Sequence, residues 1–212
     1  MVNKVAGVMG RTSDASDRLI QAALDLMWEE SYGGITIDDI CKRANVKKGS
    51  FYYFYHSKAD LAVAALDWLW QHEWKPTLDA HFSSSLEPLE RLRGYLNRTY
   101  ERQAKLKAES GQVLGCPVFT LGSEMGTQDE NVAAKIREII SLKRRYFESA
   151  IRDGIADGSM EPGDPAQKVL CLVGMVEGVL GQARIMNDPE PLRTLAETAA
   201  NLLRAKQPIT RT

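Results

Sequence analysis

The sequence has few cysteines and no long uninterrupted apolar run, and each shortage excludes a class of protein. Cys41, Cys116 and Cys171 lie far apart, without a CxxC pair or a nearby pair of histidines. This spacing favours free thiols over a disulfide framework or a zinc site, so we expect no metal and no cofactor. No segment reaches the roughly 18 consecutive apolar residues of a membrane span, and residues 1–10 lack the order of a signal peptide. We therefore expect a cytoplasmic protein without membrane association.

The motifs of common enzyme classes are also missing. We find no HExxH, no GxSxG, no glycine-rich phosphate loop and no pair of carboxylates at convincing spacing. The sequence therefore predicts a protein without catalytic residues. Its 212 residues, 44% of them hydrophobic, are enough for a buried core and suit a fold in two parts.

The formal net charge of −1 hides a local basic patch. Between Asp39 and Asp60 there is no acidic residue, and Lys4 and Arg11 in the N-terminal arm extend the basic character in sequence. The patch itself contains five basic residues: Lys42, Arg43, Lys47, Lys48 and Lys58.

Helical periodicity recurs along most of the chain, and no segment has a convincing strand pattern, which predicts an all-α fold. Thr36 and Asp39 have the spacing of a capping box, and Asn45 suits a tight turn because asparagine tolerates a left-handed backbone. We expect Pro76 to bend or end the fourth helix, and a short helix or kinked loop near residues 115–122. The expected helices are residues 13–30, 37–44, 48–54, 57–76, 88–108, 129–157, 164–186 and 191–206.

Two short helices joined by a tight turn, the second one basic and aromatic, have the layout of a helix-turn-helix between Thr36 and Tyr55. The positions expected to pack inside are Ile37, Ile40, Cys41, Ala44, Val46, Phe51 and Tyr55. The positions left facing outward are Lys47, Lys48, Ser50, Tyr53 and Phe54. Lysines neutralise phosphates, hydroxyls donate to phosphate oxygens, and Gly49 lets the backbone approach closely, so this face suits DNA. A generic solvated lysine face is the alternative interpretation.

The ordered run from Thr36 to Lys58 closely resembles the DNA-binding signature of the TetR family of transcriptional regulators. The resemblance covers residues 18–61 and includes Ser50 after Gly49 and the aromatic pair Tyr52-Tyr53. Asn45 stands where the family usually has glycine, and Phe54-Tyr55 replaces a common histidine-phenylalanine pair, which leaves a DNA contact by Phe54 open. Together, the resemblance and the outward positions assign DNA binding to Thr36, Lys47, Lys48, Gly49, Ser50, Tyr52, Tyr53 and Lys58.

The resemblance also implies a C-terminal helical domain that dimerises and binds an effector. We therefore expect residues 1–56 to bind palindromic double-stranded operator DNA and residues 57–212 to bind the effector and a second copy of the chain. Residues 169–186 are apolar on almost every side, which predicts a buried helix. Its glycines at 174, 178 and 181 permit close packing, so Gly174, Gly178 and Gly181 are the predicted dimer contacts.

Cys116 opens a glycine-cysteine segment that resembles a TetR subgroup including repressors of N-ethylmaleimide reductase and of acrylate metabolism. In that subgroup the cysteine either senses electrophiles or only shapes the pocket, and both interpretations stay open here. We expect Cys171 and Cys41 to be inert. We expect the effector to be small and apolar or electrophilic. The candidate effector-binding residues are Trp68, Tyr95, Cys116, Phe119, Tyr146 and Met175. Packing of the hydrophobic core would explain these residues equally well.

These observations predict a DNA-binding repressor that an effector releases from its operator. The alternative is a DNA-binding activator or architectural regulator that has no small-molecule effector.

Overall fold

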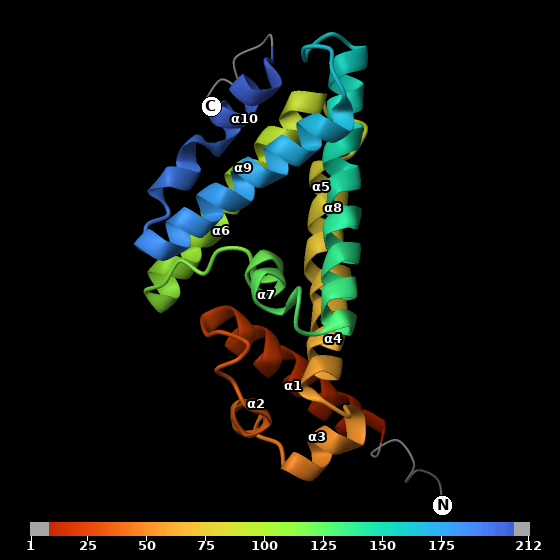
Figure 1. Ribbon diagram of the computed structural model, residues 1–212, viewed down its shortest axis with the longest axis vertical. Helices are drawn as coiled ribbons and strands as arrows, with labels where there is room; N and C mark the ends of the chain where they lie inside the picture. The colour runs from red at the N-terminus through yellow and green to blue at the C-terminus, as the bar shows by residue number, and fades with distance from the viewer. Residues whose placement is uncertain (1–8, 206–212) are drawn as a thin grey trace, which may run out of the picture. The chain divides into compact units, whose positions relative to one another are not determined.

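The computed structural model describes the backbone of residues 9–205 and the side chains of residues 14–205. Lys4, the side chain of Arg11 and Lys206 lie outside these described parts. Within them every regular element is a helix, which confirms the predicted all-α fold (Figure 1). The chain forms two compact units, residues 9–73 with 117–137, and residues 74–116 with 138–205. This division differs from the predicted functional boundary after residue 56.

The first unit is built around α1 (Met9–Glu29), which contacts α2 (Ile37–Ala44), α3 (Lys48–Phe54), α4 (Lys58–Leu69) and α7 (Pro117–Met125). Apolar residues at helical spacing on α1 and α4 are buried, and Phe51 brings the short α3 into the same interior. The fully or nearly fully buried side chains are Leu19, Ala23, Ile35, Ile40, Phe51, Leu61, Ala65 and Leu66.

Local signals set the ends of α2 as the sequence predicts. The Thr36 Oγ1 atom accepts a hydrogen bond from the Asp39 N–H, and the Asp39 carboxylate accepts one from the Thr36 N–H, which completes the capping box. Asn45 ends the helix with φ 52° and ψ 49°, in the left-handed region that asparagine tolerates. The two ends of α2 are therefore specified by three residues of the sequence, Thr36, Asp39 and Asn45.

Pro76 perturbs the helix that begins at Lys58, but it does not end it. The α-helical pattern stops at Leu69, residues Trp70–Trp74 form the π-helical segment η1, and α5 (Lys75–His81) follows. Proline lacks an N–H, and its ring conflicts with the carbonyl four residues earlier. A wider turn before Pro76 accommodates both effects.

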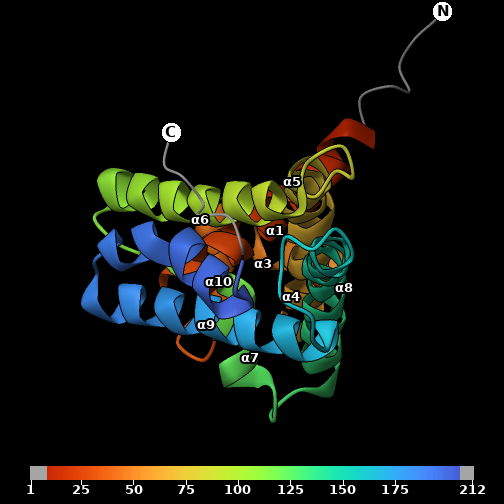
Figure 2. The same ribbon diagram turned by 90° about the horizontal axis from the view of Figure 1, so that it is seen from above.

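The second unit contains α5, α6 (Pro88–Ser110), most of α8 (Glu130–Ala156), α9 (Pro165–Met186), the 3₁₀ segment η2 (Glu190–Thr194) and α10 (Leu195–Leu203). Figure 2 shows α6, α9 and α10 side by side, in agreement with the contacts of α10 with both α6 and α9. The apolar faces of these helices and of α8 form one core, which includes Leu92, Leu96, Phe147, Ile151, Leu172, Val176, Leu180, Leu195 and Leu203.

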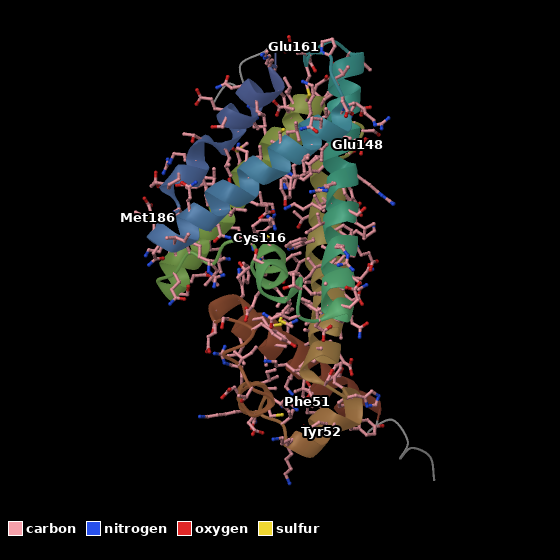
Figure 3. All side chains as sticks on the ribbon, in the orientation of Figure 1. Phe51, Tyr52, Cys116, Glu148, Glu161 and Met186 are labelled. Atoms are coloured by element: carbon pink, nitrogen blue, oxygen red, sulfur yellow. The ribbon has the colours of Figure 1, made fainter. Side chains whose placement is uncertain are left out.

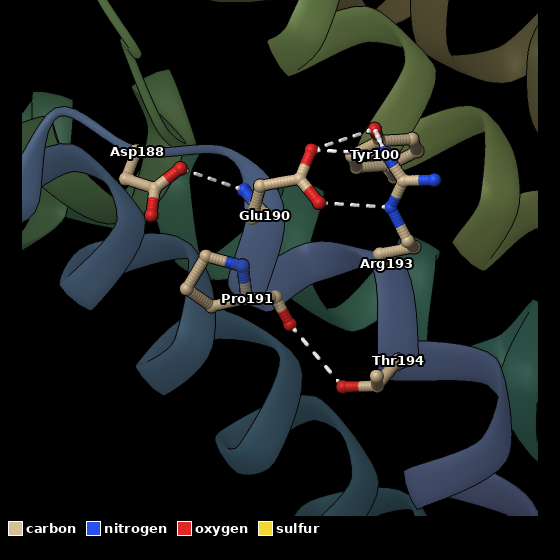
Figure 4. A network of polar contacts seen from close by, with 6 residues as sticks. All are labelled: Tyr100, Asp188, Glu190, Pro191, Arg193 and Thr194. Atoms are coloured by element: carbon tan, nitrogen blue, oxygen red, sulfur yellow. Dashed lines mark hydrogen bonds and ion pairs between the residues drawn. The ribbon is translucent and has the colours of Figure 1, made fainter.

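A polar network fixes η2 against α6 (Figure 4). The Tyr100 hydroxyl donates to Glu190 Oε1 over 3.1 Å, and Arg193 Nη2 donates to the same hydroxyl over 2.6 Å. Arg193 also pairs with Glu190, and its guanidinium lies 5.0 Å from the centre of the Tyr100 ring. These contacts interrupt the helix predicted for residues 191–206, so that α10 begins only at Leu195.

Within a single chain α9 is buried on one side only, and the predicted burial of residues 169–186 against a second copy stays a prediction. One face of α9 packs into the core, while the opposite face is exposed and carries Leu170, Cys171, Gly174, Gly178, Ile185 and Met186. Ile185 is 82% and Met186 72% exposed. Within the described residues, only α9 is long and apolar enough to meet a length-and-composition criterion for a membrane span, a criterion that core helices of soluble proteins also meet.

Candidate DNA-binding surface and effector site

The helix α3, which carries Phe51 and Tyr52 (Figure 3), has one buried aromatic ring and two exposed ones. Phe51 is completely buried, whereas Tyr52 is 51% and Tyr53 74% exposed. Lys47, Lys48 and Gly49 at the start of α3 are exposed, and Ser50 is half-buried. The inward ring therefore anchors the helix, and the basic and hydroxyl-bearing residues are left on its solvent side.

The predicted inner face of the helix-turn-helix is only partly buried. Ile40, Cys41, Ala44 and Phe51 are buried, but Ile37, Val46 and Tyr55 are half-buried, because these three lie at the edges of the short helices. The Tyr55 hydroxyl hydrogen-bonds to Ser16 Oγ over 2.8 Å, which satisfies its polar end. Phe54, predicted to face outward, is half-buried with its ring 4.8 Å from that of Tyr53.

Lys48 already has an anionic partner. Its Nζ lies 2.9 Å from Asp38 Oδ1 and 3.1 Å from Asp38 Oδ2, and both side chains are more than half exposed. The hydrogen bond and charge of Asp38 raise the pKa of Lys48 above its usual value. A phosphate that approaches Lys48 must therefore compete with this carboxylate, a feature that the sequence analysis missed.

Thr36 and Lys58, both assigned to DNA, make hydrogen bonds within the protein. The Thr36 hydroxyl donates to Asp39 Oδ2 over 2.6 Å. Lys58 Nζ donates to the carbonyl oxygens of Tyr32 and Ile35 over 2.8 Å each and lies 4.1 Å from the centre of the Tyr32 ring. Two of the three N–H bonds of Lys58 are thus used internally, and burial lowers its pKa. Thr36 therefore has no side-chain donor left for a phosphate, and Lys58 has one.

The loop between α1 and α2 is held from two directions by charged side chains. Glu124 on α7 accepts the N–H of Tyr32 over 2.9 Å and that of Gly33 over 2.6 Å. Lys58 on α4 binds the carbonyls of Tyr32 and Ile35 in the same loop. We call these contacts the loop clamp. It connects α7 and α4 to the segment that leads into the helix-turn-helix.

The six predicted effector residues are divided between the two compact units. Trp68 and Phe119 belong to the first unit, where Trp68 stacks on His72 at 4.7 Å and Phe119 is 48% exposed. Tyr95, Cys116 and Met175 pack against the core of the second unit, and the Tyr146 hydroxyl donates to Asp79 Oδ1 in that unit. The six residues therefore do not all belong to one compact unit, and an effector contact by each of them stays a prediction.

The segment that carries Cys116 is fixed by polar side chains of the second unit. The buried Gln103 donates to Gly115 O over 3.0 Å and accepts the N–H groups of Leu114 and Gly115. Arg184 donates to Leu114 O over 2.8 Å. Gly115 has φ 69°, a conformation that favours glycine. Cys116 therefore emerges half-buried, directly before α7, from a backbone held at several points.

A buried ion pair lies in the second unit, and the sequence analysis did not single it out. Lys143 on α8 and Glu177 on α9 are 7% and 5% exposed, and Lys143 Nζ lies 3.0 Å from Glu177 Oε1. The ammonium is 5.4 Å from the ring centre of Trp74 and 5.7 Å from that of Tyr95. The second oxygen of Glu177, Oε2, is buried and has no hydrogen-bond partner.

Electrostatic interactions couple this pair to Tyr95 and Cys116. Burial disfavours the charged form of Lys143, but its neighbours, among them the Glu177 carboxylate 3.0 Å away, hold its pKa well above the usual value. Burial raises the pKa of Tyr95, so its hydroxyl stays protonated at neutral pH. We refer to Trp74, Tyr95, Cys116, Lys143 and Glu177 as the buried polar cluster.

A sequence signal for the ion pair does exist. Lys143 stands four residues after Ile139 and four before Phe147, and Glu177 stands four after Val173, so both charges lie in the apolar phase of their helices. No group of three His, Cys, Asp or Glu side chains within the described residues could hold a metal ion.

The three predicted dimer glycines lie on the face of α9 away from the core. A Cβ atom added to Gly174, Gly178 or Gly181 would meet nothing within 4 Å in the single chain. Leu170, one turn before Gly174, is 49% exposed, and Ile185 follows on the same side of the helix. Met186 is labelled at the end of this helix in Figure 3.

An all-α chain with a capped helix-turn-helix and an exposed basic, tyrosine-bearing second helix has the build of a DNA-binding transcriptional regulator. Comparisons with known proteins agree. Residues 19–65 match the family described as bacterial regulatory proteins, tetR family, and residues 88–199 match the tetracycline repressor-like C-terminal domain. The second match covers just over half of the chain. The chain therefore belongs to the TetR family of transcriptional regulators, which confirms the resemblance found in its sequence.

Individual relatives are also transcriptional regulators. The chain is 30% identical over 186 residues to the transcriptional regulator AcuR of Cereibacter sphaeroides, covering 87% of this chain and 83% of AcuR. It is 23% identical over 194 residues to the transcriptional repressor NemR of Escherichia coli, covering 90% and 94%. A solved regulatory protein TetR from Rhodobacter sphaeroides superposes with a TM-score of 0.78 at 29% identity, covering 89% of this chain and 98% of that one. These relatives place the chain among regulators and not among enzymes.

Proposed function

We propose that this protein is an effector-responsive repressor, a homodimer that binds a palindromic operator and is released from it by a small apolar or electrophilic molecule. The observation that carries the proposal is the exposed face of α3, which bears Lys47, Lys48 and Tyr53. A Cβ atom added to Gly49 on this helix would meet no atom within 4 Å, so the backbone is accessible there. Family members bind DNA through this region.

In the proposed complex, the start of α3 enters the major groove. Lys47, Lys48 and Ser50 read base edges, and the glycine allows the backbone to come close to the DNA. Tyr52 and Tyr53 donate their hydroxyls to phosphates, because phosphate contacts fix the position of the helix. Lys58 contributes the one N–H that remains after its internal hydrogen bonds, whereas the hydroxyl of Thr36 is already used on Asp39, and the main role of both residues is to hold the loop before α2.

The dimer is proposed to form through the exposed face of α9 together with α10. Exposed Leu170, Ile185 and Met186 would lose water contact there, and the glycines at 174, 178 and 181 would let a partner helix approach closely. Leu202 on α10 is 41% exposed and adds to this surface. Such a dimer would hold two recognition helices about 34 Å apart, one turn of DNA.

Release is proposed to follow from a population shift, in which the effector favours a state with a different spacing of the two recognition helices. The helix α4 begins beside α3 at Lys58 and continues through η1 to Trp74 in the buried polar cluster. Cys116 lies directly before α7, which carries the Glu124 of the loop clamp. Both connections run along the chain from effector-binding residues to the DNA-binding unit.

The test is a fluorescence anisotropy titration of the purified protein with fragments of its own promoter region. We expect Lys48→Ala and Tyr53→Phe to weaken binding about tenfold without changing the helical circular dichroism spectrum. Lys105→Ala, at a lysine on α6 that is 73% exposed, serves as the matched control and should bind normally. Unchanged affinity in both α3 variants would contradict the proposed interface.

The effector is tested by a thermal-shift screen with metabolites and electrophiles, because a ligand of the native state raises its midpoint. For an electrophile that releases DNA, release from the wild type and from Cys116→Ser is compared. Equal release by both proteins would exclude a sensing role for the thiol. If no compound shifts the midpoint or releases DNA, the alternative of a regulator without an effector replaces this part of the proposal.

A further inference from the structure

The Lys143–Glu177 pair is an unusual component of an apolar helical core. Burying two charges is unfavourable unless each finds its partners, and here Lys143 Nζ satisfies only the Oε1 atom of Glu177. The other oxygen, Oε2, is buried without a hydrogen-bond partner. A pair kept only to hold α8 against α9 would not require this unused acceptor.

The neighbours of the pair come from three further parts of the second unit. Trp74 ends η1, Tyr95 lies on α6 and Cys116 precedes α7, and all three are half-buried. The two charged residues are thus enclosed, while Trp74, Tyr95 and Cys116 are each only partly buried. Binding sites for small molecules combine an apolar aromatic wall with a few polar groups in this way.

We propose that Glu177 Oε2 is the acceptor for the effector, and that the effector is a small uncharged molecule with an apolar or aromatic body and one hydroxyl or N–H donor. This inference rests on the proposed function, because it names the chemistry of the effector that the second unit takes. The donor satisfies Oε2, and the body of the molecule packs on Trp74 and Tyr95.

Charge decides between this class and its alternatives. An anionic ligand would place a second negative charge beside Glu177, whose own charge already balances Lys143. A cationic ligand would suit the aromatic rings, but the Lys143 ammonium already lies within 6 Å of both ring centres and repels it. A ketone offers only an acceptor, so it forms no hydrogen bond with Oε2 and gains none of the free energy that satisfying this buried atom provides.

The test uses four probes of similar shape: 1-phenylethanol, acetophenone, benzoate and benzylamine. Isothermal titration calorimetry with the full-length protein, without DNA, measures each dissociation constant. We expect 1-phenylethanol to bind the wild type at least about tenfold more tightly than each of the other three. Equal affinities, a preference for another probe, or no binding of any probe at about millimolar concentration would overturn the proposal.

Glu177→Gln provides the second measurement, because its amide keeps an acceptor for Lys143 and turns the Oε2 position into an N–H donor. We expect the order of the alcohol and the ketone to reverse, and benzoate to gain affinity because the charge of Lys143 is no longer balanced. Glu161→Gln, at a half-exposed residue paired with Arg204, is the matched control and should keep the wild-type order. An unchanged order in Glu177→Gln would also overturn the assignment.

The two proposals fail separately. A protein that binds its promoter but shows no preference for the alcohol retains the proposed regulatory function and loses this site. A protein that shows the expected preference but binds no promoter DNA retains the site and loses the repressor function. If Glu177→Gln does not fold, as judged by circular dichroism, the probe order of the wild type still decides the question.

Discussion

Replacing Glu124 with alanine removes the α7 half of the loop clamp and is expected to loosen the loop that leads into α2. The carboxylate accepts two backbone N–H groups, from Tyr32 over 2.9 Å and from Gly33 over 2.6 Å. Alanine can accept neither bond. The Lys58 half of the clamp, on the carbonyls of Tyr32 and Ile35, stays in place.

The size of the effect follows from the number of bonds and their exposure. A hydrogen bond to a charged group contributes about 1.5–3 kcal/mol when it is well shielded. Here the Gly33 bond is exposed and Glu124 itself is half-buried, so water replaces much of what is lost. We therefore expect local opening of the loop to become about 1–2 kcal/mol easier, a change of roughly five- to thirtyfold in the opening equilibrium.

Amide hydrogen exchange of Tyr32 and Gly33, followed by mass spectrometry or NMR, measures this opening directly. Glu130→Ala removes another carboxylate of the same unit, one that is 80% exposed and paired with Arg137, and should leave these amides unchanged. In Glu124→Ala, the free energy of operator binding should weaken by no more than the change in the free energy of loop opening. Unchanged exchange at Tyr32 and Gly33 would show that Glu124 does not hold the loop in solution.

Three further perturbations test other parts of the structure. Asp38→Asn frees Lys48 from its ion pair and should strengthen DNA binding several-fold, with a steeper dependence on salt in anisotropy titrations; weaker binding would mean that the pair positions the lysine. Ile185→Glu places a charge on the exposed face of α9 and should shift the protein toward monomer in sedimentation velocity, whereas an unaffected dimer would place the interface elsewhere. Burial, and then the charge of Arg98, hold the pKa of His81 below its usual 6.5, so the unfolded state binds more protons and stability should fall as the pH drops below 6.5. An NMR titration of His81 with a midpoint at or above 6.5 would refute that reasoning, and His81→Gln should flatten the dependence of stability on pH.

The elements of this protein were predictable where short-range chemistry decides them. Thr36 with Asp39 specifies the start of α2, and Asn45 specifies its end, because caps and left-handed positions depend on residues only a few places apart. The π-helical segment before Pro76 was not predictable. A proline inside a helical pattern permits a stop, a kink or a wider turn, and tertiary packing selects among them.

The candidate sites were less predictable, because their geometry depends on residues far apart in the chain. Nothing near Lys58 in sequence indicates that its ammonium binds the carbonyls of Tyr32 and Ile35, and Glu124 reaches the same loop from more than ninety positions away. Lys48 and Asp38 are ten positions apart on different helices, so the basic patch counted along the chain overstated the free positive charge of the surface.

Hydrophobic periodicity explains why Lys143 and Glu177 went unnoticed. A search for apolar residues at helical spacing treats a charged residue at one of these positions as a gap in the pattern. The sequence of α9 is apolar on nearly every side of the helix despite Glu177. Two such gaps of opposite sign on helices of the same unit are more informative than either gap alone, since each charge requires a buried partner. Pairing the interruptions of separate helices by sign would have made Lys143 and Arg91 the candidate partners of Glu177, whereas the choice of Lys143 and the unpaired Oε2 on which the effector proposal depends appear only in the folded structure.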